Sequence, residues 1–521
     1  MTGLVYRKLR APQQDGEQFL EPPISDFPRL WEQNRRLSSQ SWSIPHKSLR
    51  QMMLDARLEL LQLAGVPRSP ITGGLPPVVM TGHQPELFHP GVWCKNFVVG
   101  ELAKRVGAAA IHVVMDNDAA GDPAIKIPDF NGRSWHQKRV AYDVTVAAVP
   151  HEQRFPVDRR LFDTFGTRVA ASIEPLVSNP LVREMWPTAV STADQGLPIG
   201  DCIVAARRQL EQRCGLNLAV VNMSALAQTR AFASLSLQLI DMAATFRRLH
   251  NDVLRQYREV HRIRSPQQPI PDLRIDGDWI ELPCWVWTAD APIRQPVFAR
   301  SGKNYFEISD QATFAERFEG TDEGTTKVLI EQWIALTDRG VKLRPRAILS
   351  TLFFRLLLSD WFVHGIGGGK YDQITDEIIQ RLFGLTPPVF QIATSTRQLS
   401  RDHVHVDEAQ LRTSAKLLRD LKFHAEKHVP NSQTARQLVA EKRLWTTGDS
   451  AATHSAKQRH DELMRINAAL QPLVETKRAD VQARLDQDRN RLDSCRVLES
   501  REYSFCLFPE HELANILRLN L

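Results

Sequence analysis

Residues 78–93, VVMTGHQPELFHPGVW, place several side chains that can bind a ligand or exchange a proton in one short stretch. Gly82 ends an apolar run, and a glycine there lets the backbone turn sharply or approach a ligand closely. His83 and His89 can donate hydrogen bonds to a phosphate or exchange a proton near neutral pH. The stretch predicts either an anion-binding corner ahead of a helix or a structural turn whose histidines hydrogen-bond locally.

A second polar stretch, MDNDAAGD, follows the next apolar run along the chain. Its acidic residues, Asp116, Asp118 and Asp122, lie close enough together to hold a cation or to orient an amine. The residue spacing of an EF-hand calcium loop is absent. The alternative interpretation of this stretch is a solvated loop that caps a helix.

A third candidate is the glycine-rich stretch HGIGGGKYDQITDEI, residues 364–378. Glycine-rich turns ahead of a helix cradle phosphates or carboxylates through backbone N–H groups, and Lys370 would add a positive charge. The stretch is not a Walker A loop, because Tyr371 stands where that motif needs Ser or Thr. A flexible linker is the alternative, although apolar segments flank the stretch on both sides.

Two of these stretches lie at the ends of predicted strands. Residues 78–81 and 109–115 read as short apolar strands, and residues 93–106 have the apolar spacing of a helix. Strand, helix and strand at this spacing predict parallel pairing, and a third such strand is expected at 216–221. Ligands of open α/β sheets bind beyond the carboxyl ends of the strands, where both polar stretches would lie.

The rest of the chain divides into segments of different character. Residues 225–263 read as one long helix, and residues 279–288 and 295–308 read as strands. Residues 341–399 return to α/β character, in the order helix, strand, glycine turn, helix, strand.

Residues 401–500 are charged, nearly free of glycine and helical in pattern. An apolar seam from Leu463 to Cys495 predicts helices packed as a coiled-coil hairpin. Pro472 lies inside this seam and predicts a kink or a helix start.

Composition excludes several classes of protein. The 66 basic and 60 acidic residues of this 521-residue chain leave a net charge of +6, with no dense basic block, so no nucleic-acid partner is expected. The most apolar window, residues 347–367, is interrupted by Arg355 and Asp360, so no membrane span is expected. The six cysteines are scattered without a CxxC pair, which indicates free thiols in the cytoplasm rather than a zinc site.

The first two stretches together resemble the first unit of the bacillithiol biosynthesis cysteine-adding enzymes. That family has a TGQQ-type corner, a lysine in the following helix and an acidic motif after the second strand. The matching residues here are Thr81, Gly82, Gln84, Leu87, Phe88, Pro90 and Lys95, followed later in the chain by Arg344, Pro345, His364, Gly365 and Gly367. Asp116, Asn117 and Asp118 lie where the acidic motif would be. The chain departs from the family at His83, where the family has glutamine, at Asn117, where it has histidine, and at Lys370, where it has a carboxylate.

The resemblance implies a fold and a division of the chain. The fold class is α/β, with a Rossmann-like parallel-sheet core similar to nucleotidyltransferases, inserted segments and a C-terminal α-helical coiled coil. The implied segments are a core in two parts, a helical and β insertion, a coiled-coil domain and a docking tail: 1–224 and 341–400, 225–340, 401–500, and 501–521. The resemblance also implies a homodimer formed through the coiled coil.

The function implied is that of a ligase joining an amino-acid carboxylate, such as that of cysteine, to an amine of a sugar-like acceptor. ATP or ADP is the expected cofactor, and no metal ligand is assigned. The expected catalytic residues are His83, His89, Asp116 and Asp118. The expected binding residues are Thr81, Gly82, Gln84, Lys95, Asn117, Arg344, His364, Gly365, Gly367, Gly368, Lys370 and Tyr371.

Two alternatives stay open from the sequence. One is a nucleotidyltransferase-like enzyme that uses the same corners on a small phosphorylated substrate. The other is a catalytically inactive, dimeric ligand-binding or scaffold protein. All three hypotheses involve small molecules as ligands.

Overall fold

The structure is a computed structural model that describes residues 4–37, 43–44, 47–68, 73–320, 326–399, 408–447 and 455–517. It is a mixed α/β protein whose contacts divide it into two units. Unit 1 comprises Met1–Ile127, Arg139–Arg397 and Arg501–Leu521, and unit 2 comprises Pro128–Lys138 and Gln398–Ser500. The inclusion of Pro128–Lys138 in the second unit is a grouping that the sequence did not indicate.

A six-stranded sheet forms the centre of unit 1, in the order β1-β16-β15-β4-β5-β8. Neighbouring strands from β16 to β8 pair in parallel, and β1 adds an antiparallel edge. The bounds are β1 Gln18–Glu21, β4 Val78–His83, β5 Ala109–Val114, β8 Ala219–Asn222, β15 Trp361–His364 and β16 Gln391–Ser395. The predicted parallel pairing of the first two apolar runs is therefore confirmed.

Strand β4 is the point at which the strand order reverses. It pairs with β5 on one side and with β15 on the other, so connections run outward from it in both directions. Because all these strands are parallel, their carboxyl ends meet at one edge of the sheet, and a crevice forms there at such a reversal. The corners after β4, β5 and β15 must therefore lie near one another.

Helix α3, Pro90–Val106, begins directly after the first corner and packs against β4, β5 and β16. Its approach to β16 depends on Gly91, since a Cβ there would lie 2.4 Å from the carbonyl oxygen of Ser395. The helix ends at Gly107, which adopts the left-handed conformation that glycine tolerates best. The apolar residues of β4 are fully buried, as expected for a sheet covered on both faces.

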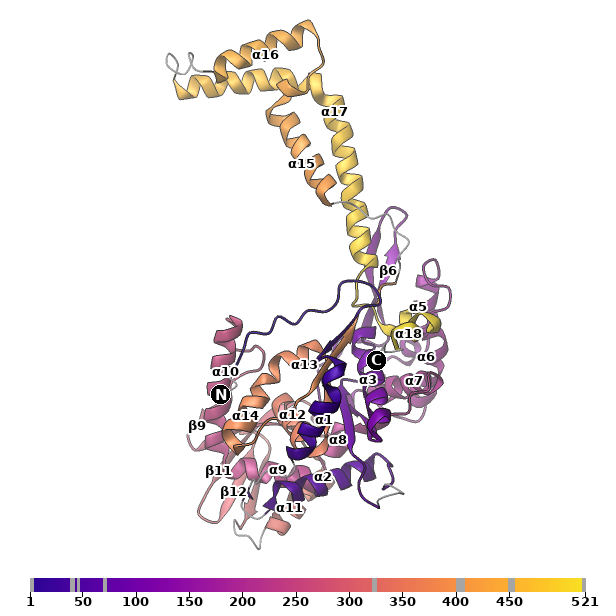
Figure 1. Cartoon of the computed structure of the whole chain (residues 1–521), viewed down its shortest axis with the longest axis vertical. Helices are drawn as coiled ribbons and strands as arrows, with labels where there is room; N and C mark the ends of the chain where they lie inside the picture. Colours follow the sequence, from indigo (N-terminus) through magenta and orange to yellow (C-terminus); the bar gives the residue numbers. More distant parts are fainter. Residues whose placement is uncertain are drawn as a thin grey trace. The chain divides into compact units, whose positions relative to one another are not determined.

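Other helices of unit 1 pack around its central sheet and the rest of the unit (Figure 1). Their bounds are α1 Phe27–Arg36, α2 Leu49–Leu63, α4 Arg159–Asp163, α5 Phe165–Ile173, α6 Val182–Ala193, α7 Ile199–Arg213, α11 Thr326–Asp338, α12 Ala347–Phe353, α13 Ile366–Tyr371, α14 Gln373–Phe383 and α18 Glu510–Leu517. The order predicted for the later α/β segment is confirmed for α12, β15, α14 and β16. The predicted glycine turn is instead the short helix α13, and Val341–Pro345 form a strand, β14, ahead of α12.

A second, antiparallel sheet has the order β13-β12-β11-β10-β14, with β9 paired to β10. Its strands are β9 Ile275–Asp276, β10 Trp279–Thr288, β11 Gln295–Ser301, β12 Tyr305–Ser309, β13 Ala315–Glu319 and β14 Val341–Pro345. The predicted strand at 279–288 is β10, and the run predicted after it forms β11 and β12.

The single long helix predicted for residues 225–263 is wrong. The structure has three helices there, namely α8 Met223–Leu226, α9 Arg230–Asp241 and α10 Ala243–His261. Thr229 caps α9, because its side chain accepts a hydrogen bond from the Phe232 N–H, and Met242 leaves the helical conformation between α9 and α10. The apolar spacing continues across both interruptions, so periodicity alone does not reveal them.

Unit 2 is built from three helices, α15 Glu408–Phe423, α16 Gln433–Thr446 and α17 Ala456–Leu498. Helix α17 passes through Pro472 without ending, so a helix start at that residue is excluded; the helix begins at Ser455 with a capping box. Figure 1 shows α17 bent within its length, with α15 and α16 beside it. Leu421 of α15 packs with Ile466, Leu470 and Val474 of α17, so the same chain covers this part of the predicted seam.

No helix among the described residues has both the length and the apolar character needed to cross a membrane.

Candidate functional site

A cleft of about 1130 Å³ opens at the carboxyl edge of the parallel sheet, and both glycine corners line it. The predicted site residues in its lining are Gly82, His83, Gln84, His89, Lys95, Asn117, Asp118, His364, Gly365, Gly367, Gly368, Lys370 and Tyr371. Three others, Thr81, Asp116 and Arg344, lie outside the lining that the described residues form. The fold therefore brings together residues from three separate corners of the sequence.

His83 is a buried, neutral member of this lining. Its ring nitrogens lie 3.2 Å from the Gln84 carbonyl oxygen and 3.2 Å from Asn96 Oδ1. Burial, followed by the charges of Lys95 and Arg207, lowers the pKa of His83 well below its ordinary value. A neutral imidazole has one N–H, so only one of the two oxygens can receive it. His83 can therefore hydrogen-bond to a ligand, but it does not supply a positive charge at neutral pH.

A buried polar network holds His83 from beneath. Asn96 Nδ2 donates to Glu211 Oε1 at 2.6 Å, which orients the Asn96 oxygen toward His83. Arg207 lies 3.2 Å from the same Glu211 oxygen and bonds His112 Nδ1 at 2.9 Å. The His112 ring lies 4.1 Å from the His83 ring, centroid to centroid. These contacts fix the position of His83 at the floor of the cleft.

His89 and Lys95 occupy the start of α3. His89 is the residue before Pro90, and burial lowers the pKa of its imidazole to about 4. Lys95 is buried, donates to the Gly82 carbonyl oxygen at 3.1 Å and forms no ion pair with any described carboxylate. Burial lowers the pKa of Lys95 to about 8. A buried ammonium without a carboxylate partner is costly, and an anionic ligand in the cleft would offset that cost.

Asp116 is buried behind the cleft. Its carboxylate accepts hydrogen bonds from the backbone N–H of Ser224, at 2.8 Å, and from the Ser224 hydroxyl. Burial, followed by the nearby Glu152, raises the pKa of Asp116 to about 7. Arg344 pairs with both oxygens of Glu152 at 2.8 Å, and Thr81 donates to the Val363 carbonyl oxygen. These contacts tie the elements around the cleft together.

The other acidic residues of this stretch also have partners. Gln84 Nε2 donates to Asp118 at 2.9 Å, Arg294 lies 3.4 Å from the same carboxylate, and Asp122 pairs with Arg139. Across the described ranges of the chain, no group of three or more His, Cys, Asp or Glu side chains could hold a metal ion. The three carboxylates thus act separately rather than as one cation site.

Asn117 lines the cleft and has a buried side-chain oxygen without a partner among the described residues. Its Nδ2 donates to the Pro345 carbonyl oxygen at 2.9 Å, whereas its buried Oδ1 has no hydrogen-bond partner. Buried polar atoms without partners are rare in folded proteins.

The second corner follows β15, and its glycines have different neighbours. A Cβ at Gly368 would lie 2.7 Å from His364 Nδ1, and one at Gly369 would lie 2.5 Å from the Ile392 side chain. A Cβ at Gly367 would meet no atom within 4 Å. Gly368 and Gly369 are therefore required for close packing of α13, while Gly367 borders open space in the cleft.

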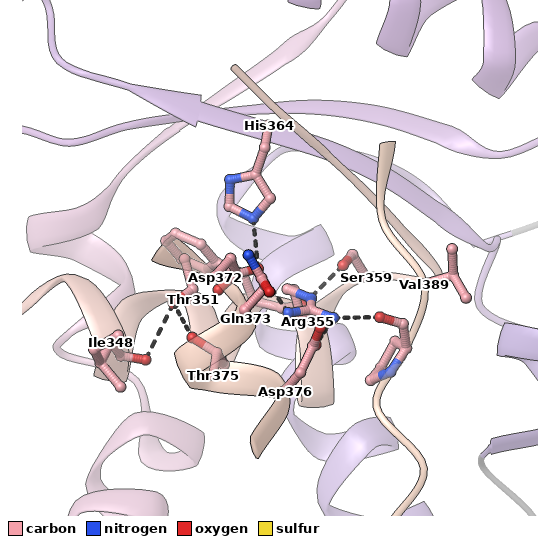
Figure 2. A network of polar contacts seen from close by, with 12 residues as sticks. Ile348, Thr351, Arg355, Ser359, His364, Asp372, Gln373, Thr375, Asp376 and Val389 are labelled. Carbon is pink, nitrogen blue, oxygen red and sulfur yellow. Dashed lines mark hydrogen bonds and ion pairs between the residues drawn. The ribbon is translucent and has the colours of Figure 1, made fainter. Parts of the chain in front are cut away.

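His364 is paired with a residue that the sequence analysis did not select. Its Nε2 lies 2.8 Å from Asp372 Oδ2, and both side chains are buried (Figure 2). Asp372 also bonds to Arg355, which stands alone as a charge inside the apolar run FFRLLL. An isolated charge in such a run signals a buried partner, and that signal could have identified this pair.

The charge of the cleft is mainly positive. Its described lining contains the cations Arg10, Lys95, Lys370 and Arg501, whereas Asp118 is the carboxylate among these residues. Lys370 is half-buried and forms no ion pair with a described carboxylate. The N-terminal segment contributes Arg10 and the segment that follows α17 contributes Arg501, neither of which the sequence singled out. This charge balance favours an anionic ligand.

A scan against protein-family models and a search of curated protein sequences each found no match for this chain.

Proposed function

We propose that this protein is an enzyme that binds an anionic small molecule in the cleft at the carboxyl edge of its parallel sheet. The observation that supports the proposal most directly is the meeting of both glycine corners around two cations, Lys95 and Lys370, neither of which pairs with a carboxylate of the described residues. Such convergence of polar groups in one large cleft is typical of substrate sites.

The reaction we propose is formation of a C–N bond, as in the cysteine-adding enzymes that the corners resemble. An amino-acid carboxylate activated by ATP would react with the amine of a sugar-like acceptor. The cationic lining would bind phosphate and carboxylate groups and stabilise the negative charge that develops on them. A proton-accepting group is also needed, because the amine nitrogen must lose a proton when it is acylated.

The finer features of the fold belong to the same proposal. The reversal of strand order at β4 supports a Rossmann-like core. The packing of α15 against α17 supports a coiled coil, and exposed apolar side chains on unit 2 support a homodimer. The six free cysteines, five of them buried, suit a cytoplasmic enzyme.

Binding and turnover test this function in two steps. ATP binding is measured by calorimetry, and ATP-dependent adducts are sought by mass spectrometry with a panel of amino acids and amino sugars. Lys370→Glu should weaken ATP binding on the order of tenfold at low salt, with a smaller effect at high salt, because screening reduces the charge reversal. Lys104→Glu, an exposed lysine in α3, is the matched control and should bind like the unaltered protein.

Each outcome separates the hypotheses. Adducts between an amino acid and an amine support the ligase. Pyrophosphate release with a sugar phosphate, in the absence of any amino acid, supports the nucleotidyltransferase alternative. Ligand binding without turnover across the panel indicates an inactive binding protein, and equal ATP affinity of Lys370→Glu at every ionic strength contradicts the location of the site.

A further inference from the structure

The pair formed by His364 and Asp372 has the geometry of a proton-transfer unit. His364 ends β15, lines the cleft and is packed between aromatic rings, with Phe362 at 4.5 Å and Phe390 at 5.0 Å between ring centroids. The close approach of Gly368 to its Nδ1 limits the ring further. These contacts hold the imidazole in one orientation at the surface of the cleft.

The hydrogen bond to Asp372 determines which nitrogen can accept a proton. An ionised carboxylate only accepts hydrogen bonds, so Nε2 of His364 carries the hydrogen in the 2.8 Å contact. The lone pair of a neutral His364 then lies on Nδ1, for which the described residues offer no hydrogen-bond partner. Burial alone would raise the pKa of Asp372, but Arg355 and then His364 hold it well below its ordinary value. The carboxylate is therefore charged at neutral pH.

Arg355 fixes the position of Asp372 through the same carboxylate oxygen that contacts His364. Its Nη1 donates to Asp372 Oδ2 at 2.6 Å, and its Nη2 donates to Asp376 Oδ1 at 2.6 Å and to the Pro388 carbonyl oxygen. Figure 2 shows these contacts converging on the guanidinium group beneath His364. Arg355 lies in a π-helical turn, Phe354–Leu358, a local geometry that often occurs at functional sites.

The geometry of this network can accommodate a proton gained by His364 during a reaction. Arg355 contacts both Asp372 and Asp376. A proton taken up at Nδ1 would leave an imidazolium whose Nε2 contacts the charged Asp372 directly. The network is therefore arranged to stabilise an imidazolium that forms during a reaction in the cleft.

We propose that His364 is the proton-accepting catalytic residue of the cleft and that Asp372 and Arg355 are its positioning residues. The proposal rests on the proposed ligase function. As the acceptor nitrogen bonds to the activated acyl carbon, the bond from that carbon to the phosphate oxygen breaks, and its electron pair leaves with the phosphate group. Nδ1 takes the proton that the nitrogen loses and passes it to the departing phosphate or to water.

Chemical modification tests the availability of Nδ1 without any substrate. Diethylpyrocarbonate reacts with an accessible unprotonated imidazole nitrogen, and mass spectrometry of the peptide that contains His364 measures the rate. We expect the wild-type residue to react. Asp372→Asn should slow the reaction on the order of tenfold, because the carboxylate bonded to Nε2 makes Nδ1 more basic. An unreactive His364 in the folded wild-type protein overturns the proposal, as does an unchanged rate in folded Asp372→Asn.

Asp372→Asn removes negative charge beside the buried Arg355 and therefore lowers the stability of the fold. A second variant tests the proposal without that change. Gly368→Ala keeps Asp372 and Arg355 intact but places a Cβ 2.7 Å from the present position of Nδ1. The ring must shift, so the modification rate should change. Gly367→Ala adds a Cβ in open space in the same helix and should leave the rate unchanged. Equal rates in both alanine variants would contradict the assigned ring position.

Kinetics separate this proposal from the proposed function. If wild-type protein forms adducts, His364→Gln should lower kcat roughly 100-fold or more with little change in KM, as expected for loss of a general base. Asp372→Asn should lower kcat less than His364→Gln and also leave KM unchanged. Unaltered kcat in His364→Gln removes the proposal while the ligase function stands. If His364 reacts at a rate that depends on Asp372 but the protein forms no adducts, the ligase function is contradicted and the assignment of His364 as a proton acceptor stands.

Discussion

At the scale of single residues, Lys95 should lower the free energy of unfolding of the ligand-free protein and should raise its affinity for an anionic ligand. The pKa of its ammonium falls from an ordinary 10.5 to about 8 through burial, so below pH 8 the fold carries the cost of a buried charge. Lys95→Met should therefore raise the free energy of unfolding at pH 7 by about 2 kcal/mol. The same variant should lose affinity for ATP. Urea unfolding and calorimetry measure the two effects.

The pH dependence of this effect has a definite sign. Between pH 8 and 10.5 the unfolded chain keeps a proton on Lys95 that the folded chain has released, so wild-type stability rises with pH through this window. The stability advantage of Lys95→Met should shrink over the same window. Lys104→Met, at an exposed position of the same helix, should show no such change. A constant difference across the window would mean that the Lys95 ammonium is well solvated.

At the scale of elements, the fit of α3 against β16 should be intolerant of added volume. A Cβ at Gly91 would meet Ser395 O at 2.4 Å and Thr394 Oγ1 at 2.7 Å, and a backbone oxygen cannot move aside as a flexible side chain can. Gly91→Ala should lower the free energy of unfolding by about 1–3 kcal/mol and distort the first corner. Denaturant unfolding and ATP affinity should both report the change.

Gly121→Ala is the matched control for that substitution. The nearest atom to its added Cβ is Glu86 Oε1, at 3.4 Å, so it should change stability little. If both variants unfold alike, the approach of α3 to β16 is looser than the distances indicate.

At the scale of the whole molecule, the proposed homodimer should depend on exposed side chains of unit 2. Leu470 is fully buried in the core of that unit, so Leu470→Asp should lower its helical content. Met464 and Phe423 are 57% and 50% exposed. Met464→Asp combined with Phe423→Asp should shift a dimer towards monomer without loss of helical content. Light scattering and circular dichroism distinguish these effects.

A monomer mass for the unaltered protein across micromolar concentrations would contradict the dimer. A dimer that the Met464→Asp and Phe423→Asp combination leaves intact would place the interface on another surface.

The sequence by itself determined the local helices and strands and the stretches in which functional side chains could lie. Apolar runs bounded by glycine identified β4 and β5, helical spacing identified α3, and the run at 279–288 was read as the strand that is β10. These signals are local, because strand and helix periodicity and glycine conformation act over a few residues. Local signals failed where a cap interrupts a continuing apolar pattern, as at Thr229.

Only the tertiary structure decided which of these elements form one site. The parallel order of β5, β4 and β15 places the corner at Gly82 beside the corner at Gly365, although they are far apart along the chain. The sequence also did not predict Asp372 as the partner of His364. Asp372 is held there by Arg355, and that contact depends on how α14 packs against the turn after α12. Strand order and helix packing arise from burial of apolar surface between distant segments, which no short stretch of sequence specifies.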